Sequence, residues 1–467
     1  MIQWDFYQRY LAGILIGPLP TFIPAPQPPV FSTDTRMLQP GAWFVPLQGP
    51  QFDGHAFLLE AQEKGAAGAL VQAGAGLPAG LSLSTITVTD PLLAYQAIAK
   101  GWRFHIHPTV IALTGSLGKT TTKELTLCLL EKNHRTVLAT KGNFNNEIGV
   151  PHTLLRLKAG DQLALLELGA RHPGDIRPLA ELVEPDIAAL LSIESVHLEV
   201  FGSMEALAKT KLEIFAHSPP HTIWVANTDN TWIAAGITPF LSTRTVITYG
   251  KSSSCTVEIQ GVEILPNGQA RMTLRIETQG CITLTLPSAH PSYVQNTAAA
   301  CAIALAAGLS PAEMQQGLGA FPGVRGRFFR IDTPTCTMID DTYNAHPSSM
   351  KAGIASLEAL FPTQEKTLVL GDMLELGDQW QEAHEQVGAL CTQLPLLRCL
   401  LTVGERGAFI AKGARNLGLS STKMKHYAST TDLMRDTSSL PPGVLYAKAS
   451  RAIGLDRLIF RFTPPSP

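Results

Sequence analysis

Residues Ile111 to Thr122 read Ile-Ala-Leu-Thr-Gly-Ser-Leu-Gly-Lys-Thr-Thr-Thr, and this stretch decides the fold of the segment around it. The pattern predicts a short apolar strand over 110–113, a Gly-rich turn, and a helix over 123–132. Backbone N–H groups of such a turn, together with the N-terminus of the next helix, can hold a polyphosphate. Lys119 would reach the terminal phosphates, and the Thr120 hydroxyl would reach Mg²⁺. The order of these parts predicts a site for ATP.

The turn departs from the general phosphate-loop pattern in one place. That pattern has a glycine five residues before Gly118, where this chain has Leu113. What remains is a shorter form, Thr-Gly-Ser-x-Gly-Lys-Thr-Thr. A plain glycine turn, with Lys119 in solvent, is the competing structural interpretation. The nucleotide loop is favoured because the strand, the turn, the Lys-Thr pair and the helix follow in the required order.

The composition is typical of a globular protein with several domains. Of 467 residues, 45% are hydrophobic and 16% are charged, and this length exceeds what one core usually supports. The net charge of −2 gives no electrostatic reason to bind nucleic acid, and no apolar run is long enough to span a membrane. Seven cysteines without a Cys-x-x-Cys pair predict reduced thiols in a cytoplasmic protein, with neither zinc nor disulfides.

Alternating strand-like and helix-like runs predict an α/β protein of three domains, with boundaries at 1–107, 108–322 and 323–467. In the middle domain, apolar strands interleaved with helices predict a mostly parallel sheet covered on both faces. They are expected at 163–168, 187–191 and 222–226. A small antiparallel addition is expected at 256–264, 271–277 and 282–286, followed by an Ala-rich helix at 296–307. The third domain is Rossmann-like in pattern but lacks Gly-x-Gly-x-x-Gly, so dinucleotide binding there is weakly supported.

Three further side chains are predicted at the carboxyl edge of the middle sheet, where ligands of open α/β sheets bind. Glu167 ends one apolar strand, His197 follows the next, and Lys211 lies on the helix that begins near residue 203. Glu and His can hold Mg²⁺ between ATP and an anionic substrate. Taken singly, each has a structural explanation as a helix cap, a loop histidine or a solvated lysine. Their shared edge favours the metal site.

The loop Thr140–Pro151 contains three Asn and two Gly. Asn-rich turns are common, so structure alone could explain this composition. Neutral amides and exposed N–H groups beside a γ-phosphate are the functional alternative. The loop by itself leaves both interpretations open.

Other motifs extend over nearly the whole chain: Ser32-Thr-Asp-Thr-Arg36 with Pro40-Gly41, Phe52 to Phe57, Gly142 to Pro151, Glu167 to Ile176, His197 to Ser203, Gly326-Arg327, Asp340-Asp-Thr-Tyr-Asn-Ala345, and Gly371-Asp-Met-Leu-Glu-Leu-Gly377 with His384. Together with the phosphate loop they resemble the Mur ligase family. The Asn-Asn-Glu-Ile-Gly-Val-Pro, Asp-Thr-Tyr-Asn-Ala and Gly-Asp-Met-x-Glu-Leu-Gly stretches are characteristic of its branch that joins D-alanyl-D-alanine to UDP-N-acetylmuramoyl-tripeptide.

The resemblance implies a UDP-substrate-binding domain, a central ATPase domain, and a C-terminal Rossmann-like domain that closes over the site. It implies an ATP site formed by Gly115, Ser116, Leu117, Gly118, Lys119, Thr120, Thr121, Asn296, Arg327 and Asp341. It implies substrate contacts from Ser32, Thr35, Arg36, Asp53, Asn143, Asn146, Tyr343 and Asn344. Mg²⁺ would be held by Thr120, Glu167, His197 and Lys211. Lys211 matches a position that is N-carbamylated in the family, and the catalytic residues would be Lys119, His197 and Lys211.

The chain also departs from the family pattern. The usual Asn-x-Gly-x-Ala before the histidine reads Ser192-Ile-Glu-Ser-Val196. The other replacements are Arg171 for Asn, Leu212 for Gly, His346 for Asn, and the pair Ser292-Tyr293 for His-Asn. Glu194 and Arg171 could form a compensating pair.

The implied reaction is ATP-dependent amide formation, in which a peptide carboxylate becomes an acyl phosphate and the amine of D-Ala-D-Ala displaces phosphate. One alternative is a sister ligase with another acceptor, such as a tripeptide-forming Mur ligase or a folylpolyglutamate synthase. The resemblance places Thr35 and Arg36 in a uridine-nucleotide site, and folylpolyglutamate synthases lack the UDP-binding first domain. This uridine motif, at residues 33–36, therefore argues against the synthase. Another is a catalytically silent nucleotide-binding scaffold, against which the intact Lys119, Glu167, His197 and Lys211 argue. The expected partners are small molecules, the expected state is a cytoplasmic monomer, and the expected hinge is Phe321–Val324.

Overall fold

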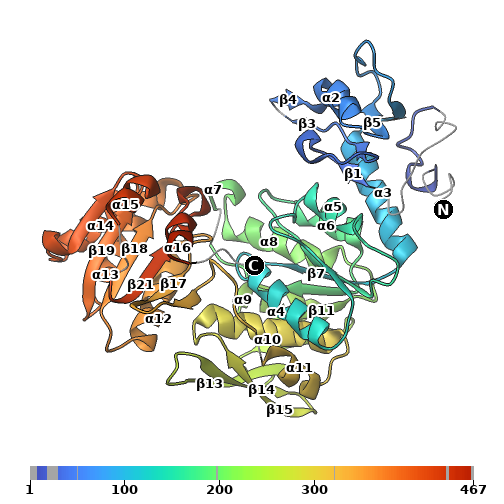
Figure 1. Cartoon of the computed structure of the whole chain (residues 1–467). Coiled ribbons are helices and arrows are strands. Elements are labelled where there is room, and N and C mark those ends of the chain that lie inside the picture. Colours follow the sequence, from blue (N-terminus) through green and yellow to red (C-terminus); the bar gives the residue numbers. More distant parts are fainter. Residues whose placement is uncertain are drawn as a thin grey trace.

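The computed structural model describes residues 8–17, 30–49, 51–195, 198–319, 321–437 and 441–463. Three main sheets follow one another along the chain and form three bodies (Figure 1). The predicted α/β class is confirmed. Residues 18–29, which are rich in proline, lie outside the described residues, as does His197.

The first body is a small parallel sheet of four strands in the order β1-β2-β5-β6. Its strands are β1 (Phe31–Ser32), β2 (Trp43–Phe44), β5 (Gly68–Gln72) and β6 (Ser84–Val88). A short hairpin, β3 (Gln48–Gly49) and β4 (Phe52–Asp53), and the helix α2 (Leu58–Glu63) complete it.

Helix α3 (Pro91–Ile106) joins the first body to the second (Figure 1). It begins with Pro91 at its first position and with the Asp90 carboxylate, which accepts the N–H of Leu92 at 2.7 Å. Near its start, the ring of Tyr95 packs against Phe31 of the small sheet. Near its end, the Trp102 indole donates to the carbonyl of Leu157 in the middle body at 2.9 Å. One hydrophobic core therefore runs through both bodies.

The second body is built on nine strands in the order β15-β14-β13-β12-β11-β10-β7-β9-β8. Strands β7 to β13 pair in parallel, and β13, β14 and β15 pair antiparallel, as predicted. The strands are β7 (Thr109–Thr114), β8 (Val137–Ala139), β9 (Leu163–Glu167), β10 (Ile187–Leu190), β11 (Ile223–Asn227), β12 (Val246–Gly250), β13 (Val257–Ile264), β14 (Ala270–Ile276) and β15 (Gly280–Leu286). The antiparallel strands continue the parallel sheet, so the two parts share one core.

Helices cover both faces of this sheet. They are α4 (Lys119–Lys132), α5 (Gly149–Leu154), α6 (Ile176–Val183), α7 (Leu198–Phe201), α8 (Met204–Ala216), α9 (Thr231–Ile237), α10 (Pro291–Ala306) and α11 (Pro311–Leu318). Successive residues of β7 point to opposite faces. Val110 and Ala112 pack on the side of α3, α6 and α8, whereas Ile111 and Leu113 pack on the side of α4 and α10.

The third body has six strands in the order β16-β17-β21-β18-β19-β20, of which only β16 runs antiparallel to its neighbour. The strands are β16 (Phe329–Asp332), β17 (Cys336–Asp340), β18 (Lys366–Gly371), β19 (Leu397–Val403), β20 (Met424–Tyr427) and β21 (Gly443–Lys448). The helices are α12 (Pro347–Leu360), α13 (Trp380–Cys391), α14 (Gly407–Asn416), α15 (Thr430–Asp436) and α16 (Asp456–Phe462). Among the described residues, no helix is both long and apolar enough to cross a bilayer.

Candidate active site

The predicted phosphate loop lies between β7 and α4, at the carboxyl edge of the nine-stranded sheet. Helix α4 begins at Lys119, four residues before the predicted start. The first N–H that bonds within the turn is that of Thr122, to the carbonyl of Gly118 at 2.9 Å. The N–H groups of the three preceding residues have no acceptor in the helix. They form an anion site of the kind the sequence predicts.

Gly118 is required at its position for two reasons. Its φ is 87°, in the left-handed region that favours glycine. A Cβ there would also collide with the side-chain oxygen of Asn296, a residue of α10. The structure therefore places Asn296, a predicted nucleotide residue, directly against the phosphate loop.

Ser192 and Glu194, in the segment that departs from the family pattern, bond to Ser116 and Leu117 of this loop. The N–H of Ser116 donates to the Ser192 carbonyl at 2.8 Å, and that of Leu117 donates to the Ser192 hydroxyl at 2.9 Å. The N–H of Glu194 donates to the Ser116 hydroxyl at 3.0 Å. In the described part of the chain no ion pair joins Glu194 to Arg171, so the hypothesis of a compensating pair is wrong.

Lys119 folds back over the loop. Its Nζ donates to the carbonyl of Gly115 at 2.6 Å. Burial is the main cause that lowers the pKa of Lys119 to about 8; the charge of Glu167 opposes this shift, and the charge of Arg327 adds to it. The Lys119 ammonium therefore lies against the phosphate loop. It does not extend into solvent, as the competing structural interpretation requires.

Glu167 stands at the end of β9 and is 1% exposed. Its Oε1 is buried without a hydrogen-bond partner among the residues described. Burial raises its pKa, while the charges of Lys123, Lys119 and Arg327 and the adjacent Thr120 side chain oppose the shift. A carboxylate oxygen with open lone pairs beside a hydroxyl suits a hard cation, so these residues fit Mg²⁺.

Lys211 is buried on α8, with 3% of its surface exposed. The structural explanation as a solvated lysine is therefore wrong. Burial, and then the charge of Lys119, lower the pKa of Lys211 to about 7, against the opposing effects of Asp175 and Glu213. Lys119, Glu167 and Lys211 are therefore brought together as predicted, while His197 lies outside the described residues.

The third body contributes Arg327 to this edge. Its guanidinium stacks on the ring of Tyr343 at 3.8 Å, and its charge acts on both Lys119 and Glu167. Its Nε is buried without a hydrogen-bond partner in the described structure. Asp341 is turned into its own domain instead, where its carboxylate accepts from Lys448 Nζ at 2.7 Å. Asn344 is exposed beside this pair, and its carbonyl accepts a second bond from Lys448 at 2.9 Å.

Four of the residues predicted to bind substrate lie in the first body. In the first body Thr35 is buried, and the Ser32 hydroxyl donates to the carbonyl of Asp34. Arg36 is exposed and pairs with the Asp34 carboxylate at 2.7 Å. Asp53 is exposed and accepts from His55 Nδ1 at 2.7 Å; hydrogen bonds from His55 lower the pKa of Asp53 to about 2.

In the Asn-rich loop, the Asn146 side chain accepts the N–H of Gly149 at 2.9 Å, and Asn143 is exposed. The structural explanation of this loop therefore holds for Asn146, whereas Asn143 is free to serve a ligand.

Three residues of the site were not singled out from the sequence as site residues. Ser192 was noticed only as a departure, Lys123 only as part of a helix, and Tyr293 only as a replacement. The Tyr293 hydroxyl accepts the N–H of Val324, in the predicted hinge, at 3.2 Å. The available signal was a lysine one turn after Lys119, but the sequence does not show which face of α4 is buried.

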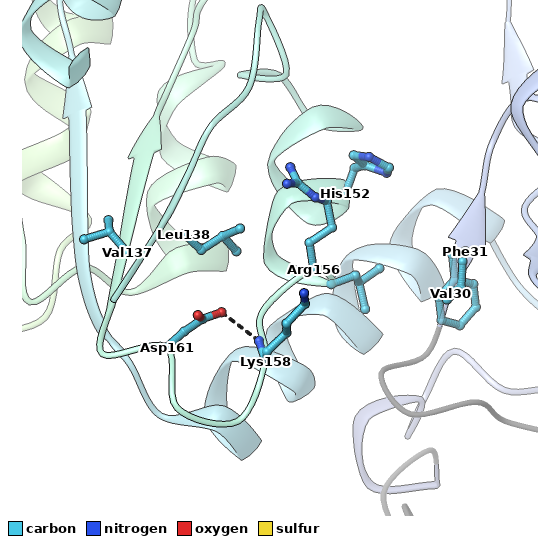
Figure 2. Close-up of a pocket in the computed structure, with 9 residues that line it drawn as sticks. Val30, Phe31, Val137, Leu138, His152, Arg156, Lys158 and Asp161 are labelled. Carbon is cyan, nitrogen blue, oxygen red and sulfur yellow. Dashed lines mark hydrogen bonds between the residues drawn. The ribbon is translucent and has the colours of Figure 1, made fainter. Parts of the chain in front are cut away.

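Two cavities lie away from the phosphate loop. The first, of about 330 Å³, opens between β1, β8 and α5 and is lined by none of the predicted site residues (Figure 2). Its polar lining comprises His152, Arg156, Lys158 and Asp161. The second, of about 530 Å³, lies between the second and third bodies. At its rim His346 Nε2 donates to the Ser195 carbonyl at 2.9 Å, so two departures from the family pattern contact each other.

Comparisons with known proteins agree over most of the chain. The family model of the Mur ligase middle domain matches residues 113–304, and that of the Mur ligase glutamate ligase domain matches residues 326–446. The UDP-N-acetylmuramoyl-tripeptide–D-alanyl-D-alanine ligase of Bacillus subtilis is 35% identical over 92% of both chains. A crystal structure of MurF from Acinetobacter baumannii superposes with a TM-score of 0.84, at 30% identity, over 98% of this chain and 97% of that one. MurF from Thermotoga maritima, solved in complex with ADP, gives a TM-score of 0.79 at 28% identity, over 93% and 97%.

Proposed function

Because this chain belongs to the Mur ligase family, we propose that it is an ATP-dependent ligase that adds D-alanyl-D-alanine to UDP-N-acetylmuramoyl-tripeptide, in the synthesis of peptidoglycan precursors. The observation that carries the proposal is the convergence of Lys119, Glu167, Lys211 and Arg327 on one sheet edge. A plain nucleotide-binding scaffold would need the phosphate loop but not a buried carboxylate and a second buried lysine beside it.

The residues fit a phosphoryl transfer followed by acyl transfer. An oxygen of the peptide carboxylate attacks the γ-phosphorus of ATP, ADP leaves, and an acyl phosphate forms. The amine of the dipeptide then attacks the acyl carbon, phosphate leaves, and the amine nitrogen gives up a proton. The N–H groups at the start of α4 would bind the phosphates, and Lys119 and Arg327 would neutralise the charge that develops on them.

We also propose that Mg²⁺ binds here and neutralises phosphate charge when bound. Thr120 and Glu167 would hold it, with His197 and a carbamate on Lys211 as further ligands. No group of three His, Cys, Asp or Glu side chains that could hold a metal occurs within the described residues, so nucleotide oxygens and water would complete the coordination.

We propose domains at 1–107, 108–322 and 323–467, with Ser32, Thr35, Arg36 and Asp53 in the uridine-nucleotide site. Asn143, Asn146, Tyr343 and Asn344 would contact the rest of the substrate, and Asn296 and Asp341 would contribute to the nucleotide site. The protein would act as a monomer in the cytoplasm, on small-molecule substrates rather than nucleic acid.

Phosphate release with UDP-N-acetylmuramoyl-tripeptide, measured with and without D-Ala-D-Ala, tests this function. We expect release that depends on the dipeptide. Release that requires a different amine would identify a sister ligase. ATP binding without turnover under any of these conditions would identify a scaffold and overturn the proposal.

Domain closure is a second expectation. Arg327 lies in the third body, yet it would act on a nucleotide held by the second, so its approach depends on how the two bodies are placed. Closure would also exclude water from the acyl phosphate. Phe321–Val324 is the expected hinge, and the N–H of Val324 donates to the Tyr293 hydroxyl of α10 at 3.2 Å. Small-angle scattering should show a smaller radius of gyration with an ATP analogue and the UDP-substrate than without them. Identical profiles would contradict closure.

A further inference from the structure

Lys123 is a buried cation that no step of the proposed reaction uses. It lies on α4 one turn after Lys119, and its side chain is 4% exposed. A lysine is almost never buried so fully unless it is paired. Oxygens from three elements surround its Nζ: the Thr140 carbonyl at 2.7 Å, Glu124 Oε1 at 2.7 Å and Glu167 Oε1 at 3.8 Å.

Thr140 connects Lys123 mechanically to Glu167. It follows β8 and begins the Asn-rich loop. Its hydroxyl accepts the N–H of Glu167 at 3.0 Å, and its own N–H donates to the Leu165 carbonyl at 3.0 Å. With its carbonyl bound by Lys123, Thr140 is held from both sides. Lys123 thereby fixes the nucleotide helix to the strand end that carries Glu167.

The geometry of the Lys123–Glu167 pair leaves the carboxylate available. A separation of 3.8 Å is too long for a hydrogen bond, and Glu167 Oε1 has no other partner among the residues described. The ammonium therefore compensates the buried negative charge without occupying the lone pairs of that oxygen. Lys123 Nζ donates its hydrogen bond to the Thr140 carbonyl, and it forms its closer ion pair with Glu124.

We propose that Lys123 is a positioning residue that presents the Glu167 carboxylate to Mg²⁺. The inference rests on the proposed function in one respect, that Glu167 is a ligand of the metal. Mutation of a group that orients a metal ligand without contacting the metal typically lowers metal affinity or activity by about 10- to 100-fold. We expect an effect of that size at Lys123.

The test compares the affinity for ADP, measured by calorimetry with Mg²⁺ and with EDTA. Lys123→Gln removes the charge and keeps an N–H donor on a shorter side chain, and Lys123→Arg keeps both the charge and the donor. Lys132→Gln, on the exposed end of the same helix, is the matched control. In wild type, Mg²⁺ should tighten ADP binding. In Lys123→Gln, the affinity for ADP should fall about 10- to 100-fold when Mg²⁺ is present and should not change in EDTA. Lys123→Arg should recover most of this affinity. The control should bind ADP as the wild type does.

Other outcomes would overturn the proposal in distinguishable ways. A full Mg²⁺ effect in Lys123→Gln, or an equal loss of affinity in EDTA, would show that Lys123 acts only on the fold. No Mg²⁺ effect in wild type would refute Glu167 as the metal ligand, and the positioning role with it. Thermal unfolding shows whether each variant is folded. Thr140→Val changes no charge and removes only the hydroxyl that accepts the Glu167 N–H, so it gives the same comparison if Lys123→Gln does not fold.

Discussion

Replacement of Lys119 by alanine should abolish ligation while leaving UDP-substrate binding intact. The Lys119 ammonium lies over the phosphate loop, and its loss removes the charge that neutralises the γ-phosphate as it is transferred. Removal of one such group from a preorganised site lowers turnover by about 10³-fold. Initial rates of phosphate release, together with calorimetry for the UDP-substrate, measure the two effects separately.

The selectivity of this loss follows from the placement of the two sites. The uridine motif follows β1 in the first body and runs into a 3₁₀ helix at Thr35–Met37, whereas Lys119 begins α4 in the second body. Lys132→Ala, at the exposed end of α4, should leave both measurements unchanged. An equal loss of UDP-substrate affinity in Lys119→Ala would contradict the separation of the sites.

The second large effect is expected at Lys211. Because of this residue, the activity of the wild-type protein should depend on CO₂. An ammonium next to Lys119 would repel Mg²⁺, whereas a carbamate on the same nitrogen reverses the charge and offers oxygen ligands. Lys211→Ala should reduce turnover by about 10²-fold, and added short carboxylates should restore part of it. Lys209→Ala, two residues away and exposed on the same helix, is the matched control.

The pH dependence has a defined sign. Carbamylation requires the neutral amine, and burial lowers the pKa of Lys211 to about 7. The amine is therefore mostly neutral above that pH and mostly protonated below it. Activity should fall as the pH is lowered through 7, and removal of CO₂ should produce a loss at pH 8 that bicarbonate reverses. Full activity of Lys211→Ala without a rescuing carboxylate would refute the carbamate.

The sheets were predictable because their strands are apolar runs of the right length. Helix starts were less so. The helix at 296–307 begins five residues earlier, at Pro291, although proline is a start signal and the His290 side chain accepts the N–H of Ser292. Helix α4 begins at Lys119, because Gly118 in a left-handed conformation turns the chain directly into it.

Within the site, Lys119, Glu167 and Lys211 were predictable because the carboxyl ends of parallel strands share one edge. The partners that support them were not. Ser192 lies more than seventy residues from the loop it holds, and the contact exists only because β10 pairs with β7. Lys123 faces inward only because the sheet lies behind α4. Such side chains acquire their role from packing, which a local pattern does not contain.

Helix α3 is shared by two bodies, and this makes it a lever. Its last turns are anchored in the middle body, where Lys100 pairs with Glu184 at 2.7 Å and Arg103 donates to the carbonyl of Glu184. Its first turns support the small sheet through Tyr95. Sixteen residues of helix are about 24 Å long, so a tilt of about 10° at the anchored end would move the other end by about 4 Å. A substrate gripped by the small sheet could thus be swung through several ångströms by a slight repacking around Trp102.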